Sequence, residues 1–335
     1  MARERLRQRR ALAGAMSLLV VLAACSSSGG REAEEENQQQ GGGGGGSGPT
    51  EHTIAFVTHE APGDTFWTIV RNGAEEAAKR HNVELVYSNS PEAAEQANLV
   101  QNAIDSEVDG IAVTMSKPDA MGPAVQRAVD AGIPVVALNA GQDAWQQAGA
   151  SMFFGQDETV AGEAAGQRLS EAGVSKVLCV IHEQGSVSLE ARCNGAAATF
   201  SGTMEKLYVD GTDMPSVRST IQAKLAEDPN IERVLTLGAP FAMTAVQSVA
   251  DAGADAQVVT FDTNAELVDA IKSGDVLWAV DQQPYLQGYL AVSGLWLNVT
   301  NGNEIGGGRA VLTGPSFVTQ ENIDEIAQYA ERGTR

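Results

Sequence analysis

Residues 54–73 read IAFVTHEAPGDTFWTIVRNG, which combines a strand, a loop and the start of a helix. The first five residues are apolar and rich in β-formers, and the Pro-Gly pair that follows predicts a loop. The helix opens at Phe66 and Trp67, so the loop places the Asp64 carboxylate beside two aromatic rings. Ligands of open α/β sheets bind at the carboxyl ends of the strands. The stretch therefore predicts either one wall of a binding site or aromatic core residues at a helix start.

The same strand-loop-helix pattern repeats along the rest of the chain. Short apolar runs predict strands at residues 54–58, 84–87, 110–114, 134–138, 151–154, 176–181, 205–209, 233–237, 257–261 and 277–280. Helical patterns between them include residues 93–105, 121–131, 160–172, 216–226, 242–252 and 265–273. Strands joined by helix-length crossovers predict parallel sheets that are covered on both faces.

An internal repeat indicates that one βα design occurs twice. Residues 118–132, PDAMGPAVQRAVDAG, match residues 240–253, PFAMTAVQSVADAG, with one deletion. Each copy leads into a similar strand, VVALN or VVTFD, and these strands end at Asn139 and Asp262. Chance similarity between alanine-rich helices is the alternative. A genuine repeat predicts two matched lobes.

Two matched sheets placed face to face would bring their strand ends together across a crevice. Polar groups at such positions are Asp64, Thr114 and Asn139 in the first half, and His182, Glu183, the Gly238 backbone, Asp262 and residues 281–283 in the second. Taken singly, each of them fits a helix cap or a loop. Their repeated position after successive strands predicts a polar binding cleft.

The amino-terminal segment has the features of an export signal. Five Arg precede an apolar stretch of 14 residues, Ala11–Ala24, which is shorter than the roughly 20 residues of a bilayer span. It ends in Leu-Ala-Ala-Cys25, which resembles a bacterial lipobox. We therefore expect residues 1–24 to be a lipoprotein signal peptide and Cys25 to carry a lipid, so that the protein is exported and anchored to the outer face of the cell membrane, or periplasmic. An ordinary signal peptide that leaves Cys25 as a free thiol is the alternative.

Composition limits the partners and the redox state. The polar, glycine-rich residues that follow Cys25 predict a flexible tether over residues 25–50. The formal net charge is −21, and the loss of five Arg and one Glu with residues 1–24 leaves −25. Such a surface repels phosphate backbones, so we expect no nucleic acid partner. Disulfides persist outside the cytosol, and we predict a bridge between Cys179 and Cys193, with two buried free thiols as the alternative.

Signatures of catalysis and of metal binding are few. The sequence lacks a GxSxG elbow, a Walker loop, an HExxH motif and a CxxC pair. Its four His lack metal-ligand spacing, so we expect no metal and no cofactor. His182 and Glu183 form the one pair suited to acid–base chemistry. A surface enzyme acting on glycans is a minor alternative, because no second carboxylate accompanies this pair at a plausible position.

From residue 52 onward, the chain resembles the periplasmic-type sugar-binding proteins of ABC importers, in the ribose- and galactose-binding group with the type I solute-binding fold. The motifs that carry the resemblance are GDTFW, RNGAEEAAK, DGIAVT, AGIPVVALNA, GQDETVAGEAAG, SLEARCNG, VVTFDTNAE and DQQPYLQGYLAV. The resemblance implies an α/β fold with two similar doubly wound parallel-sheet lobes, a three-strand hinge and a ligand cleft between the lobes. It implies an N-terminal lobe of residues 52–156 plus 283–313 and a C-terminal lobe of residues 157–282 plus 314–335.

The resemblance also implies which residues contact a ligand. Phe66 and Trp67 would stack on a sugar ring, and Asp64 would occupy the polar slot before them. Asn139 and Asp262 stand at positions where the family has sugar-binding Asp residues.

Further contacts are implied around the hinge and the second lobe. Arg192 matches the family's strand-end arginine, with Ser188 one helical turn before it, and Gln282 matches a hinge-side amide. Gln156 would face the ligand while Asp157 caps a helix. Ala140 and Gly238 stand where ribose binders have Arg and Asn. These departures indicate a different pentose, a hexose, a polyol or a cyclitol.

The resemblance thus implies a monomeric lipoprotein that captures a monosaccharide or polyol by lobe closure and delivers it to an ABC-transporter permease. LacI-type repressors share the fold but carry an N-terminal helix-turn-helix, whose place is taken here by the export signal and tether. A sensor lobe that presents a sugar or a sugar-like signal to a membrane receptor is the alternative. The sequence alone leaves both open.

Overall fold

The computed structural model describes residues 51–335. The predicted signal peptide, the predicted lipidation site Cys25 and the predicted tether lie outside the described residues. Among residues 51–335, no helix is both long enough and apolar enough to cross a membrane.

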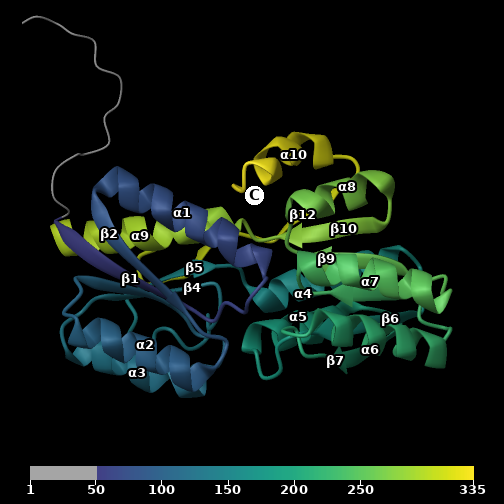
Figure 1. Cartoon of the computed structure of the whole chain (residues 1–335), viewed down its shortest axis with the longest axis horizontal. Coiled ribbons are helices and arrows are strands. Elements are labelled where there is room, and N and C mark those ends of the chain that lie inside the picture. Colours follow the sequence, from purple (N-terminus) through teal and green to yellow (C-terminus); the bar gives the residue numbers. More distant parts are fainter. Residues whose placement is uncertain (1–50) are drawn as a thin grey trace, which may run out of the picture. The chain divides into compact units, whose positions relative to one another are not determined.

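Two six-stranded sheets organise the described residues (Figure 1). The first has the order β11-β5-β4-β3-β1-β2, with β1 (His52–Thr58), β2 (Val83–Asn89), β3 (Gly110–Thr114), β4 (Val135–Leu138), β5 (Met152–Gly155) and β11 (Val311–Leu312). The second has the order β12-β10-β9-β8-β6-β7, with β6 (Lys176–Ile181), β7 (Thr203–Tyr208), β8 (Arg233–Thr236), β9 (Gln257–Phe261), β10 (Val276–Asp281) and β12 (Ser316–Thr319). The strand pairs are parallel except β10 and β12, which are antiparallel.

Helices cover both faces of each sheet. In the first lobe these are α1 (Thr65–His81), α2 (Ala93–Asp105), α3 (Pro118–Asp130) and α9 (Pro284–Asn301). In the second lobe they are α4 (Glu158–Glu171), α5 (Val187–Thr199), α6 (Met214–Glu227), α7 (Ala239–Ala252), α8 (Ala265–Ser273) and α10 (Ile323–Glu331). Figure 1 shows α1 and α9 on one side of the first sheet and α2 and α3 on the other. The predicted pair of doubly wound parallel-sheet lobes is confirmed.

The strand β1 shows how the sequence produces two cores in one lobe. Successive side chains of a strand point to opposite faces. Ile54 and Phe56 accordingly pack with α1 and α9, whereas Ala55 and Val57 pack with α2 and α3. An apolar run without alternation is therefore buried on both sides, as the parallel sheet requires.

The two copies of the internal repeat begin their helices earlier than predicted. The helices α3 and α7 start three residues before the predicted positions, and both carry Pro in their first turn, at Pro118 and Pro240. Proline fits the first turn because its missing N–H would have had no partner within the helix. The shared start supports a common design for the two copies.

Three chain segments connect the lobes, after β5, after β10 and between β11 and β12. The latter two are hydrogen-bonded to each other. Gln283 Nε2 donates to the carbonyl of Thr313 at 2.6 Å, and Thr313 Oγ1 donates to the carbonyl of Gln282 at 2.6 Å. These bonds tie two of the three connecting segments of the hinge to each other.

The helices α1 and α9 approach so closely that glycine is required at their contact. A Cβ at Gly288 would overlap the carbonyl oxygen of Val70, and a Cβ at Gly73 would overlap that of Tyr285. By contrast, a Cβ at Gly122 in α3 would meet no heavy atom of another element within 4 Å. The position of α1, which carries Phe66 and Trp67, thus depends on small residues.

We predict effects of very different size for two Gly→Ala substitutions. Gly288→Ala should lower the free energy of unfolding by about 1–3 kcal/mol, because α9 must move away from α1. Gly122→Ala should change it by less than about 1 kcal/mol, because the helix preference of alanine is opposed by the crowding of the new Cβ against the ring of Pro123. Urea unfolding followed by circular dichroism measures both. Equal effects of the two substitutions would contradict the close packing described above.

Candidate ligand-binding site

A cavity of about 140 Å³ lies between the two lobes, at the carboxyl ends of strands from both sheets. The predicted contact residues that line it are Asp64, Phe66, Trp67, Asn139, His182, Glu183, Ser188, Arg192, Gly238, Asp262 and Gln282. Several apolar residues that the sequence did not single out also line it, among them Leu189, Leu237 and Phe241. Most of the repeated strand-end positions therefore converge on one cavity.

Two of the predicted contact residues lie behind the cavity wall. Thr114 is fully buried, and its hydroxyl bonds to His59 Nδ1 at 2.7 Å and to Gln96 Nε2 at 3.0 Å. Gln156 Nε2 donates to Glu158 Oε2 at 2.8 Å, so its side chain turns toward the start of α4. Neither residue lines the cavity, so contact between Gln156 and a ligand stays a prediction. The neighbouring Asp157 does cap α4, as predicted.

The wall from the first lobe is built by the stretch at the start of α1. Asp64 caps this helix by accepting the backbone N–H of Phe66 at 3.0 Å. Phe66 and Trp67 meet edge to face with ring centroids 5.1 Å apart. Both rings belong to the core shared with α9 and both line the cavity. Phe66 and Trp67 are thus both core residues and part of the cavity wall, so the two alternatives raised by the sequence apply at once.

The repeat places two matched polar side chains at the cavity. Asn139 and Asp262 both have left-handed backbones, with φ of 63° and 64°. Each donates its backbone N–H to the neighbouring strand at 2.8 Å, to Phe154 in one lobe and to Val280 in the other. Asn and Asp adopt this conformation more readily than most other residues. The same turn therefore ends equivalent strands in both lobes.

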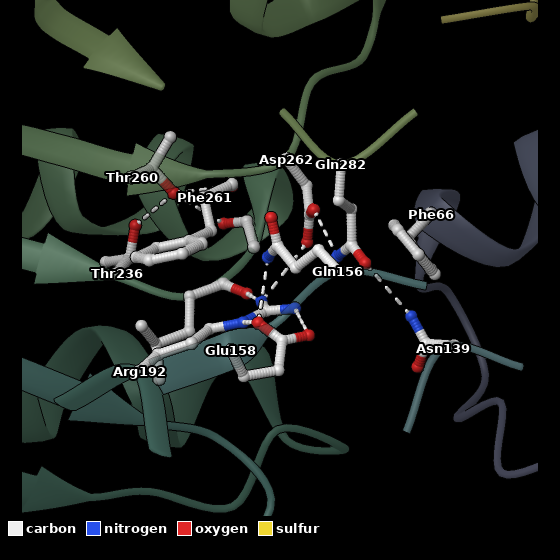
Figure 2. Close-up of polar contacts among 12 residues, drawn as sticks. Phe66, Asn139, Gln156, Glu158, Arg192, Thr236, Thr260, Phe261, Asp262 and Gln282 are labelled. Atoms are coloured by element: carbon white, nitrogen blue, oxygen red, sulfur yellow. Dashed lines mark hydrogen bonds and ion pairs between the residues drawn. The ribbon is translucent and has the colours of Figure 1, made fainter. Parts of the chain in front are cut away.

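Gln282 joins these two strand ends across the lobes (Figure 2). Its Oε1 accepts from Asn139 Nδ2 at 3.2 Å, and its Nε2 donates to Asp262 Oδ1 at 2.7 Å. Gln287 Nε2 donates to the same Oε1 at 2.9 Å. A hinge residue thus connects the polar groups of both halves of the cavity.

Arg192 reaches the cavity from a different element than expected. It lies in the second turn of α5 and not at a strand end. Its Nε and Nη2 donate to the two oxygens of Glu158 at 2.6 and 2.8 Å, and its Nη1 donates to the carbonyl of Leu237 at 3.1 Å. Nη1 also lies 3.7 Å from Asp262 Oδ2. Figure 2 shows the guanidinium between Glu158 and Asp262.

Glu158 was not identified from the sequence. Its position in the first turn of α4 is typical of a residue that only balances the helix dipole. A disulfide between Cys179 and Cys193, with Cα atoms 6.1 Å apart, attaches α5 to β6 beside Arg192 and confirms the predicted bridge.

Burial sets the protonation of the titratable groups around the cavity. It raises the pKa of Asp64 to about 6 and that of Asp262 to about 7, against the opposing effect of Arg192. It lowers the pKa of His59, and it lowers that of His182 to about 3 with help from Arg192. His182 stacks on Phe241 with centroids 3.8 Å apart. The imidazoles are therefore neutral, while the carboxyls are poised to titrate near neutral pH.

The lobes touch each other beside the cavity. Glu183 of the second lobe accepts from Ser116 Oγ at 3.1 Å and lies 3.5 Å from Lys117 Nζ, both in the first lobe. The backbone N–H of Val187 donates to the carbonyl of Ser116 at 3.0 Å. Asn264 Nδ2 donates to Thr65 Oγ1 at 3.1 Å. These bonds hold the two lobes against one another around the cavity.

Comparison with known proteins identifies a family that matches the chain. The sequence profile of a family described as "Periplasmic binding protein domain" matches residues 54–304. A solved structure of a carbohydrate transporter from Acidothermus cellulolyticus 11B, in complex with myo-inositol, is 56% identical. That similarity has a TM-score of 0.84 and covers 85% of this chain and 99% of the other.

The sequences of more distant relatives align with most of this chain. The xylose/arabinose-binding protein of Sulfolobus acidocaldarius is 24% identical over 72% of this chain, which spans 64% of that relative's length. The xylitol-binding protein of Mycolicibacterium smegmatis is 24% identical over 79% of this chain and 77% of its own length.

Proposed function

The chain belongs to the family of periplasmic binding protein domains, and from this premise we propose that it captures a cyclic polyol or monosaccharide between its lobes. The captured ligand would be delivered to the permease of an ABC importer. The observation that carries the proposal is the cavity between the lobes, which combines two aromatic rings with buried hydrogen-bonding groups from both sheets.

The chemistry of the cavity suits a ring that carries hydroxyls on its edge. Such a ring presents C–H faces, which Phe66 and Trp67 would cover, and O–H groups, which need paired donors and acceptors. Asp64 and Asp262 would accept these hydroxyls, and Arg192 would donate to their oxygens. Because a relative at 56% identity holds myo-inositol, we propose a cyclitol of this kind as the first candidate. Ala140 supports a ligand other than ribose, since it supplies no guanidinium.

Lobe closure would remove the ligand from water. The contacts that Ser116, Lys117 and Thr65 make with the other lobe favour the closed arrangement. Glu183 is held by these cross-lobe partners, and the pKa of His182 is too low for proton transfer near neutral pH. The proposal therefore assigns binding and no turnover to this pair. The relatives' binding and transport roles support import over the sensor alternative.

Anchoring through a lipid on Cys25 is a further part of the proposal, supported by the Leu-Ala-Ala-Cys sequence that ends the apolar stretch. Mass spectrometry of the mature protein from its native host should find Cys25 as the first residue, carrying acyl chains. An unmodified amino terminus at any other residue would refute the anchor.

A ligand panel tests the binding function. Myo-inositol, xylitol, D-xylose and D-ribose are titrated by calorimetry and by tryptophan fluorescence, which Trp67 should supply. We expect at least one to bind, and we expect Arg192→Ala and Asp262→Ala each to weaken binding by about tenfold or more, because each leaves ligand hydroxyls and buried partners unpaired. Arg218→Ala, on the exposed face of α6, is the matched control and should leave affinity unchanged. Absence of heat and of fluorescence change across this panel would count against the proposal.

Affinity should increase as pH rises through the pKa values of Asp64 and Asp262, about 6 and about 7 in the free protein. Ligand hydroxyls donate to the ionised carboxylates and lower both pKa values. Binding therefore releases protons at pH values between the pKa of a carboxyl in the bound protein and its pKa in the free protein. Calorimetry from about pH 5 to 8, in buffers of different ionisation enthalpy, measures the affinity and the released protons. Asp262→Asn should abolish the proton release near pH 7 and leave the proton release near pH 6 unchanged. An affinity that is constant or highest at low pH would contradict this linkage.

A further inference from the structure

We propose that Glu158 makes the site selective for uncharged polyhydroxylated rings, because it pairs the positive charge of Arg192 and so denies that charge to an anionic ligand. This inference rests on the proposed binding function and extends it by naming the residue that excludes sugar acids and other anions. Glu158 does not line the cavity and acts through Arg192, so it is a positioning residue.

The pairing of the two side chains is as complete as their geometry allows. Both oxygens of Glu158 accept from Arg192, at 2.6 and 2.8 Å, in the two-pronged arrangement that suits a guanidinium and a carboxylate. The exposed fractions are 7% for Glu158 and 3% for Arg192, so water screens the pair little. Gln156 donates to Glu158 Oε2 at 2.8 Å and orients it further. The two N–H groups of Arg192 that could bind a ligand carboxylate are therefore already bonded to Glu158, which does not line the cavity.

Close packing of α4 against α5 creates this pair. A Cβ at Gly162 would overlap the carbonyl of Arg192, and a Cβ at Gly166 would overlap that of Ala196. On the opposite helix, a Cβ at Gly195 would overlap the carbonyl of Thr159. The glycines of the GQDETVAGEAAG and SLEARCNG motifs thus bring the first turn of α4 within reach of Arg192. The disulfide at Cys193 holds α5 on its other side.

The charges around the cavity make this neutralisation decisive. Among the described residues that line the cavity, Arg192 is the only Lys or Arg, whereas Asp64, Glu183 and Asp262 are acidic. The two histidines that line it have lowered pKa values and supply no positive charge near neutral pH. With Arg192 paired to Glu158, an anionic ligand would meet only carboxyls and neutral dipoles. The remaining N–H groups of Arg192 can still donate to a neutral hydroxyl.

The test compares three probes on the full-length protein and on three variants. The probes are myo-inositol, D-glucuronate as the anionic ring, and D-glucose as its neutral match in size. Glu158→Gln removes the negative charge, Glu158→Asp retains it on a shorter side chain, and Glu171→Gln makes the same chemical change on the exposed end of α4. Calorimetry gives the affinity of each probe, and thermal unfolding shows whether each variant is folded.

We expect Glu158→Gln to shift the affinity for glucuronate, relative to myo-inositol, by about tenfold or more in favour of glucuronate. Glu158→Asp and Glu171→Gln should keep the wild-type ratio, which a merely structural role for Glu158 would not predict. An unchanged ratio in Glu158→Gln overturns the proposal. If that variant does not fold, the wild-type protein decides between the outcomes. Binding of glucuronate as tight as that of glucose would overturn the proposal, and binding of glucose without binding of glucuronate would support it. Failure of every neutral ring to bind the wild type would instead refute the proposed function.

Discussion

A buried guanidinium is the group on which the rest of the second lobe's site depends. Arg192 is almost wholly removed from water, and an unpaired charge in that position would cost several kcal/mol. The carboxylate of Glu158, the carbonyl of Leu237 and the ring of Phe261, 4.8 Å from the guanidinium carbon, surround it. These partners come from α4, from the loop after β8 and from β9. Three separate elements must therefore take their places before the charge can be buried.

The hinge extends this arrangement into the first lobe. Arg192 lies beside Asp262, Gln282 connects Asp262 to Asn139, and Asn139 stands at the matching strand end of the other sheet. The polar groups of both lobes are thus linked through a residue of a connecting segment (Figure 2). Any movement of the lobes changes the distances within this chain of bonds. The site and the hinge are for that reason parts of one network.

The cavity has two chemically different walls. The first lobe presents aromatic rings that belong to its own core, so their orientation is set by packing against α9. The second lobe presents paired charges and the neutral imidazole of His182, so it offers directional hydrogen bonds with little net positive charge. A ring with apolar faces and a hydroxylated edge complements both walls together. The proposed ligand class follows from that combination more than from any single residue.

The sequence by itself determined the fold and most of the polar residues that line the cavity, because local patterns specify the strands and their ends and the family resemblance specifies the other positions. Apolar runs of strand length specify buried parallel strands, and the repeat specifies that Asn139 and Asp262 end equivalent strands. The two cysteines left after the export signal were enough to predict their bridge.

Only the tertiary structure decided which side chains face the cavity and which stand behind it. Thr114 ends β3 and Gln156 follows β5. Thr114 nevertheless bonds to His59, 55 residues earlier in the chain, and Gln156 turns to Glu158 at the start of α4. Arg192 sits within a helix, where local patterns do not reveal the direction of a side chain. The approach of α4 to α5, made possible by glycines on both helices, sets its partner. Such long-range packing leaves no local signal, because it depends on how two complete helices meet.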